Sequence, residues 1–175
     1  MFLSLGSNLG NRAQYLQHAL FLLHREVGQV VRVSPLYESP AWGFSSEPFY
    51  NICAELHTDL PLEVLLPKLH AIEARLGRVR TSQPSEGYKA RTLDIDILYY
   101  GDKIVQTNTL CVPHPQLAQR RFVLQPLADI APDFVDPIKG QTIKQLLQVC
   151  PDTSALTVVK QGFSVPVNKT STPYH

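Results

Sequence analysis

Long apolar runs, paired cysteines and an excess of charge of either sign are all missing from this 175-residue chain. No apolar run approaches the roughly 18 residues that a membrane span needs, and residues 1–5 lack the basic-then-apolar order of a secretory signal. The 16 lysines and arginines nearly balance the 15 acidic residues, so no global charge points to nucleic acid or an anionic membrane. Cys53, Cys111 and Cys150 lack zinc-ligand spacing, so we expect reduced thiols in a cytoplasmic protein.

The composition is that of an ordinary globular protein, with 44% hydrophobic and 18% charged residues. The length is enough for one domain with a substantial core. Residues after about 160 carry Pro166, Pro173 and several Ser, Thr and Asn residues. We therefore expect one domain over residues 1–160 and a flexible C-terminal tail over residues 161–175.

Hydrophobic periodicity and turn residues divide the domain into strands and helices. Strands are expected at 2–6, 29–37, 49–58 and 91–100, and helices at 12–26, capped by Asn11, and at 61–76, with Pro61 near the start. A short hairpin over 103–111 and helices over 121–130 and 142–149 are expected to follow. The order strand–helix–strand–strand–helix–strand is typical of a ferredoxin-like α+β fold, an antiparallel sheet with helices on one face, here with C-terminal helical additions.

Asp94 and Asp96 are the most informative residues of the chain. They alternate with Leu93, Ile95 and Ile97 in a strand-like pattern, so both carboxylates are expected on one face, about 6–7 Å apart. Two such carboxylates repel each other unless water, cations or a hard metal ion surround them. A solvated acidic strand face is one interpretation; the other is a magnesium site shared with substrate phosphates.

Basic residues on both sides of the acidic pair favour the phosphate interpretation. Residues 77–91 hold Arg78, Arg80, Lys89 and Arg91 against a single acid, and their Gly, Pro and Ser content indicates a mobile loop. Downstream, residues 112–121 add three more basic side chains: His114, Arg120 and Arg121. Magnesium and arginine forks together bind polyphosphates, so a phosphate site explains the clustering better than isolated surface ion pairs do.

Four motifs in order resemble the 6-hydroxymethyl-7,8-dihydropterin pyrophosphokinase (HPPK) family. They are GSNLG at 6–10, RTLDIDI at 91–97, VPH at 112–114 and RRFVLQPL at 120–127, and the resemblance covers residues 1 to about 150. It implies a ferredoxin-like α+β fold, ATP as co-substrate and two Mg²⁺ ions. It also implies transfer of the terminal pyrophosphate of ATP to the pterin hydroxymethyl group, with release of AMP.

The resemblance assigns roles residue by residue. Asp94 and Asp96 match the metal ligands, Arg78 matches a mobile-loop arginine that assists turnover, and Arg91 matches a residue that binds the triphosphate. The other positions that match nucleotide-binding residues are Glu73, Arg80, Ile97, His114 and Arg120. The positions that match pterin-binding residues are Ser39, Pro40, Trp42, Asn51 and Phe122. The sequence departs from the family pattern at Tyr88, where several members carry Trp, and at Phe49, which replaces a frequent Tyr.

The chemistry of a pterin agrees with these assignments without requiring them. A flat heterocycle with polar edges needs aromatic faces and a few donors and acceptors. Phe49, Phe122 and Trp42 can supply faces, and Asn51 both donates and accepts. Core packing explains Phe49 and Phe122 equally well, while a strand-end hydrogen bond explains Asn51. GSNLG lacks the Lys-Ser/Thr of a phosphate loop and is interpreted as a structural turn beside the pocket.

A noncatalytic ferredoxin-like module that binds nucleotides or RNA is the alternative. An RNA-binding module of this kind would show exposed aromatics on adjacent strands and a basic surface, and neither pattern is present. We therefore expect ATP and the pterin as small-molecule partners, no nucleic acid, no membrane, and a monomer.

Overall fold

The computed structural model describes residues 1–41, 47–78, 91–160 and 162–164. Its main sheet contains β1 (Phe2–Ser7), β2 (Gln29–Val33), β3 (Leu36–Ser39), β4 (Phe49–His57), β5 (Asp94–Tyr99) and β8 (Thr157–Val159). A second, two-stranded sheet is formed by β6 (Val105–Gln106) and β7 (Cys111–Val112). The helices are α1 (Arg12–Glu26), α2 (Leu62–Arg75), the 3₁₀ turn η1 (Leu117–Gln119), α3 (Arg121–Ile130) and α4 (Ile143–Gln148).

The sheet is antiparallel throughout, in the order β5-β1-β4-β3-β8, with β2 also paired to β4. β4 lies between β1 and the β2–β3 segment, and β1 lies between β4 and β5, so each βαβ unit is split by a strand of the other. This confirms the expected mixed α/β architecture with an antiparallel sheet, and it is compatible with the ferredoxin-like arrangement. Within the described residues, no helix combines the length and apolarity that a membrane span requires.

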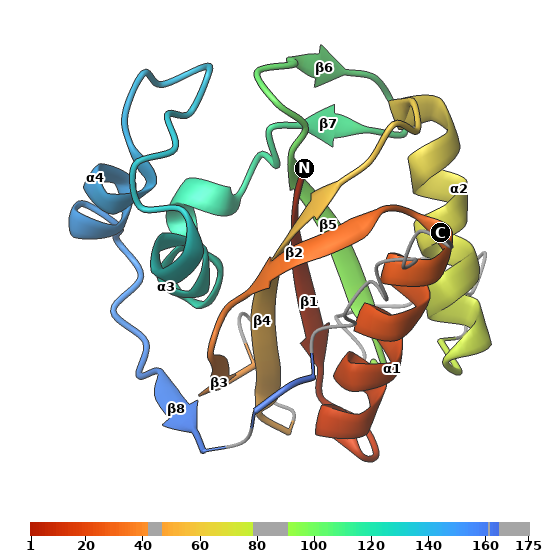
Figure 1. Cartoon of the computed structure of the whole chain (residues 1–175). Helices are drawn as coiled ribbons and strands as arrows, with labels where there is room; N and C mark the ends of the chain where they lie inside the picture. The colour runs from red at the N-terminus through yellow and green to blue at the C-terminus, as the bar shows by residue number, and fades with distance from the viewer. Residues whose placement is uncertain (42–46, 79–90, 161, 165–175) are drawn as a thin grey trace, which may run out of the picture.

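Helices cover both faces of the sheet (Figure 1). The larger core lies between the sheet and α1 and α2, where Leu16, Leu20, Leu65 and Leu69 are fully buried. The C-terminal helices α3 and α4 build a second core on the opposite face; its members include Phe2, Cys53, Tyr99, Val123, Leu127 and Ile143.

Most element boundaries agree with the sequence, including the cap at Asn11, whose side chain accepts a 3.1 Å bond from the backbone N–H of Gln14. The single strand expected over 29–37 is wrong, because the structure breaks it between Val33 and Leu36. Pro35 has no N–H to donate to the hydrogen bonds between strands. At Ser34 the side chain takes the place of a backbone acceptor, because Ser34 Oγ accepts the N–H of Cys53 at 2.9 Å. Strand β8 and η1 were not expected.

The chain after residue 160 is described only at residues 162–164. There Phe163 packs against the larger core, and Ser164 exchanges two bonds with the Gln17 side chain on α1, at 2.9 and 3.0 Å. The boundary placed at residue 160 therefore remains a sequence-based prediction.

Candidate active site

One cross-strand row connects the acidic pair to the expected pterin residues. Asp94 on β5 lies opposite Gly6 on β1, and Gly6 lies opposite Asn51 on β4. Residues directly opposite one another project from the same face, so Asp94 and Asn51 flank a position without a side chain. A Cβ at Gly6 would lie 3.2 Å from Asn51 Oδ1 and 3.5 Å from Phe49 Cδ1. Gly6, which has no side chain, thus separates the two halves of the candidate site on this face of the sheet.

Asp94 is held by two arginines. Arg78 Nη1 lies 2.7 Å from Asp94 Oδ1, and Arg91 Nη1 lies 3.1 Å from Asp94 Oδ2. Arg78 also forms an ion pair with Glu73, whose side chain is only 1% exposed near the end of α2. The guanidinium of Arg78 thus bridges a buried carboxylate and the accessible carboxylate of Asp94.

Asp96 has a different electrostatic environment. Its side chain is 37% exposed, yet the surrounding protein still limits hydration of the carboxylate, which lies 4.0 Å from His114 Nε2. Burial first, and the nearby Asp94 charge second, raise the pKa of Asp96 to about 7, against the opposing influence of Arg120, Arg78 and Arg91. The charge of Asp94 thus disfavours the ionised form of Asp96.

His114 is influenced by both the acidic pair and Arg120. Burial, with the positive charge of Arg120 as the next cause, lowers the pKa of His114 to about 4, so its ring is neutral near pH 7. His114 Nδ1 accepts the backbone N–H of Gln116 at 3.2 Å, which places the ring proton on Nε2, facing Asp96. The backbone N–H of His114 donates to Leu98 O at 3.1 Å and fixes the residue against β5.

The expected pterin half is built on β3 and β4. Asn51 is buried, and its Nδ2 donates a 2.7 Å bond to Ser39 Oγ, which fixes the carboxamide in one orientation. Phe49 lies two residues before Asn51 and shares its face, as the distances around Gly6 show. Pro40 follows directly after β3 and is exposed to solvent. Asn51 therefore presents Oδ1 toward Gly6.

Phe122 and Arg120 come from the start of α3. Cys53 Sγ lies 3.5 Å from Val123 O, which places the first turn of α3 over β4, one step along the face from Asn51. Arg120 Cζ lies 5.6 Å from the centre of the Phe122 ring, and Arg120 donates to Gln116 Oε1. The helix thus carries an aromatic ring and a cation to the edge of the same face.

The remaining nucleotide candidates lie near α2. Glu73 is buried and paired with Arg78, and Ile97 is 5% exposed within the core that α1 and α2 cover. Ile97 therefore presents little surface to a ligand. A pocket of about 740 Å³ opens between α2 and the β6–β7 hairpin, with a mainly apolar lining that includes Leu62, Leu66, Pro67, His70, Val105 and Leu110.

Two of the expected site residues, Trp42 and Arg80, lie outside the described residues. All the others are described. The structure brings Asp94, Asp96, Arg78, Arg91 and His114 together at one end of β5. Ser39, Asn51 and Phe49 lie across Gly6 from them.

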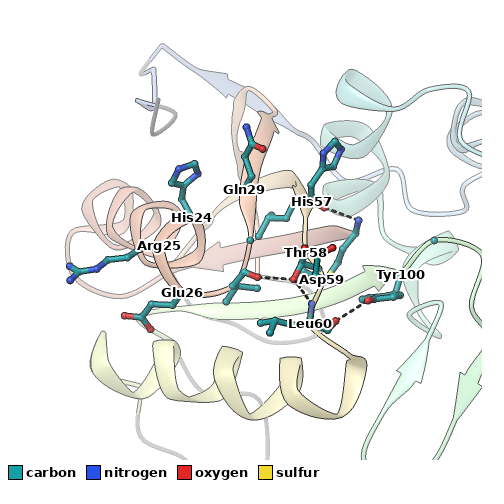
Figure 2. A pocket seen from close by; sticks show the side chains of 14 residues that line it. His24, Arg25, Glu26, Gln29, His57, Thr58, Asp59, Leu60 and Tyr100 are labelled. Carbon is teal, nitrogen blue, oxygen red and sulfur yellow. Dashed lines mark hydrogen bonds between the residues drawn. The ribbon is translucent and has the colours of Figure 1, made fainter. Parts of the chain in front are cut away.

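Another pocket, of about 810 Å³, lies at the opposite end of the sheet, where the turns after α1, β4 and β5 meet. Tyr100 closes one side by donating a 2.8 Å bond to Leu60 O, and Figure 2 shows His24, Arg25 and Gln29 spread over the rim rather than converging on one point. This pocket is separate from the site around Asp94, because its lining residues Tyr100 and Gly101 follow the end of β5, whereas Asp94 begins that strand.

Asn8 is the residue whose position was not anticipated. The sequence marked GSNLG only as a turn, yet the Asn8 side chain is 1% exposed and bonds to both Glu47 and Arg91. A small polar residue between two glycines was the only sequence signal, and such residues are common in ordinary turns.

The acidic pair fits a hard divalent cation. Asp94 and Asp96 offer only oxygen ligands, and because burial and the charge of Asp94 raise the pKa of Asp96, a cation beside it would favour its ionised form. Within the described ranges, no group of three or more His, Cys, Asp or Glu side chains is arranged as a metal site. Two carboxylates completed by water and substrate phosphates match the preference of magnesium.

Comparison with known protein families identifies the family to which the chain belongs. The family 7,8-dihydro-6-hydroxymethylpterin-pyrophosphokinase (HPPK) matches residues 2–132. This chain belongs to the HPPK family. The assignment confirms the resemblance carried by the four motifs, and the matched range includes every residue of the candidate site.

Several HPPK relatives share much of the sequence. A Synechocystis 2-amino-4-hydroxy-6-hydroxymethyldihydropteridine pyrophosphokinase is 41% identical over 162 residues, covering 92% of this chain and 80% of that protein. A Porphyromonas gingivalis protein of the same name is 43% identical, covering 75% of this chain and 90% of that one. The Pneumocystis carinii folic acid synthesis protein fol1 is 40% identical and covers 82% of this chain.

Some relatives are much longer than this chain. It spans 19% of the Pneumocystis protein. Among solved structures, a Plasmodium falciparum HPPK-DHPS chain superposes with a TM-score of 0.67 at 16% identity, covering 84% of this chain and 43% of that one. At that identity the likeness supports the fold alone, and it agrees with the HPPK assignment.

Proposed function

We propose that this chain catalyses ATP-dependent transfer of pyrophosphate to 6-hydroxymethyl-7,8-dihydropterin, releasing AMP, as a step of folate biosynthesis. The observation that carries the proposal is the row Asp94–Gly6–Asn51, because it brings the residues proposed to bind phosphate and those proposed to bind the pterin onto one face of the sheet. The same reaction is supported by the membership of this chain in the HPPK family and by its similarity to relatives named as pyrophosphokinases.

The pterin would lie over Gly6, between Phe49 and Phe122, with Asn51 at its polar edge. Because Ser39 already accepts one amide hydrogen of Asn51, the carboxamide is oriented before a ligand arrives. Trp42 and Pro40 complete the proposed aromatic and apolar surround. Such preorganisation favours a flat heterocycle with a specific donor–acceptor edge.

The nucleotide would extend from the acidic pair toward α2. The pocket between α2 and the β6–β7 hairpin has an apolar lining suited to a base, and it lies one helical turn from Glu73. Arg80, Arg91 and Arg120 would bind the phosphates. His114 would act as a neutral donor through Nε2, because its lowered pKa removes the positive charge near pH 7.

In the reaction, the hydroxymethyl oxygen attacks the β-phosphorus in line. The new O–P bond forms as the bond from that phosphorus to the α-bridging oxygen breaks, AMP leaves, and the hydroxyl proton passes to solvent. Asp94 and Asp96 would hold two Mg²⁺ ions, which when bound lower the pKa of the hydroxyl and neutralise phosphate charge. Arg78 and Arg91, held beside Asp94, then keep positive charge where the transferred group becomes more negative.

The proposed setting is a cytoplasmic monomer that consists of one domain over residues 1–160. The three cysteines are free thiols, and Cys53 is buried under α3. The RNA-binding alternative is not favoured, because the family match is to HPPK and because β5 carries two carboxylates on one face of the sheet. Paired aspartates would repel a nucleic-acid backbone.

The test is a turnover assay with ATP, Mg²⁺ and 6-hydroxymethyl-7,8-dihydropterin, in which AMP is separated and measured. We expect AMP only when the pterin is present. Asp96→Ala should abolish its formation while circular dichroism stays native, and the exposed Asp102→Ala serves as the matched control. Absence of pterin-dependent AMP from the wild-type protein would refute the proposal.

A further inference from the structure

Asn8 connects two segments that belong to different halves of the proposed site. Its Nδ2 donates to Glu47 O at 3.1 Å, and its Oδ1 accepts the backbone N–H of Arg91 at 2.6 Å. The backbone N–H of Asn8 donates to Arg91 O at 3.0 Å. Both main-chain groups of Arg91 are thereby held by one buried residue.

The two partners of Asn8 stand next to proposed binding groups. Glu47 is followed by Pro48 and Phe49, where the pterin half begins. Arg91 pairs with Asp94 through its side chain and so belongs to the phosphate half. The Asn8 carboxamide is planar and bonds to both segments, so a movement of Glu47 would shift the carboxamide and with it the backbone of Arg91.

Arg12 offers a contrast, because it anchors the pterin-side segment without touching Arg91 in any described contact. Arg12 Nη1 donates to Pro48 O at 2.8 Å and to Glu38 Oε2 at 3.1 Å. Its guanidinium lies 3.7 Å from the centre of the Tyr50 ring. Losing Arg12 would loosen one half of the site and leave the connection through Asn8 in place.

We propose that Asn8 is a positioning residue that couples the pterin-side segment at Glu47 to Arg91, so that each substrate raises the affinity for the other. This inference rests on the proposed function, because it takes the two halves to be the pterin and nucleotide sites. A purely structural turn residue would change the stability of the fold and leave the affinities of the two ligands independent.

The isosteric variant Asn8→Asp separates these roles. It keeps an oxygen for the Arg91 N–H and removes the donor to Glu47 O, since an ionised carboxylate only accepts. Titration calorimetry would measure binding of a non-hydrolysable ATP analogue with Mg²⁺, with and without saturating pterin. The coupling factor is the ratio of the two dissociation constants.

For the wild type we expect a coupling factor of about tenfold, within the usual range for linked sites. In Asn8→Asp the factor should fall to about one, while the affinity for the ATP analogue alone stays unchanged. Arg12→Met should weaken pterin binding and keep the wild-type coupling factor. Asn8→Ala should weaken the binding of both ligands, because it removes both side-chain bonds.

Three results would overturn the role of Asn8. They are a coupling factor of one in the wild type, wild-type coupling in Asn8→Asp, and an equal loss of coupling in Arg12→Met. If the wild type forms pterin-dependent AMP in any of these cases, the proposed function stands and only the inference about Asn8 fails. If the wild type binds no pterin and forms no AMP, both fail together.

Discussion

Arg78 and Asp94 meet through a 2.7 Å contact between Nη1 and Oδ1, and the same guanidinium pairs with the buried carboxylate of Glu73. The side chain of Arg78 is only 11% exposed, so its orientation is fixed largely from inside the protein. The two ion pairs link the end of α2 to the start of β5. The same side chain therefore contributes to the stability of the domain and holds Asp94 in position.

Removing Arg78 should therefore reduce stability as well as activity. Arg78→Met leaves Glu73 buried without this charge partner, and breaking a buried ion pair from one side costs about 3 kcal/mol. The double variant Glu73→Gln, Arg78→Met should recover most of that loss, because it removes the remaining charge. Urea unfolding of the two singles and the double measures the coupling, and identical stabilities for Arg78→Met and the double variant would contradict it.

A methyl group at Gly6 should impair pterin binding more than nucleotide binding. In Gly6→Ala the new Cβ would lie 3.2 Å from Asn51 Oδ1, so the oriented carboxamide must shift. We expect the KM for the pterin to rise about tenfold, a cost within the range for inserting a methyl group at a packed site. Gly162→Ala is the control, because its Cβ meets nothing within 4 Å; an equal rise in KM there would exclude this explanation.

The magnesium requirement should increase as the pH falls. The pKa of Asp96 is raised to about 7 by burial and by Asp94, so protons and metal compete for its carboxylate below that pH. The Mg²⁺ concentration for half-maximal rate should rise toward about tenfold per pH unit below pH 7. Rates measured against Mg²⁺ at pH 6, 7 and 8 would test this, and a constant Mg²⁺ requirement would argue against Asp96 as a ligand. Removal of Mg²⁺ with a chelator should stop turnover at every pH.

In metal-free protein, Asp96 and His114 should affect stability with opposite signs. The raised pKa of Asp96 contributes stability at low pH that is lost as the pH rises through about 7. The lowered pKa of His114 contributes stability above its ordinary value of 6.5 that is lost as the pH falls through about 4.

Two variants separate these contributions. Between pH 4 and 7, the unfolding free energy of Asp96→Asn relative to the wild type should increase with pH, and that of His114→Gln should decrease. Thermal or urea unfolding in chelator at several pH values measures both trends. Slopes of the same sign would show that the electrostatic assignment of one of the two residues is wrong.

Local patterns were sufficient to predict much of this fold and the acidic pair. The cap at Asn11, the stripe of leucines on α1 and the alternation around Asp94 each depend on near neighbours in sequence. The break at Ser34 and Pro35 depends on a distant partner, since Ser34 Oγ replaces a ladder acceptor for Cys53. The alternation of residues within one strand does not indicate which distant residue will pair with it.

The candidate site divides in the same way. The face shared by Asp94 and Asp96 follows from strand alternation, and the side chains that surround them follow from the family resemblance. Asn8 bonds to Glu47 and Arg91, which lie 39 and 83 positions further along the chain. Such contacts arise from the order of strands in the sheet, which local sequence patterns leave undetermined.

Strand β8 has a practical consequence for the design of shorter versions of the protein. It lies beyond the matched family range of residues 2–132 and pairs with β3 from Leu36 to Glu38. A chain ended at residue 132 would expose the backbone donors and acceptors of β3, and exposed strand edges recruit other chains into aggregates. With β8 in place, the outermost strand on this side has only three residues. A shortened version that keeps β8 would therefore keep the edge of the strand that carries Ser39 paired.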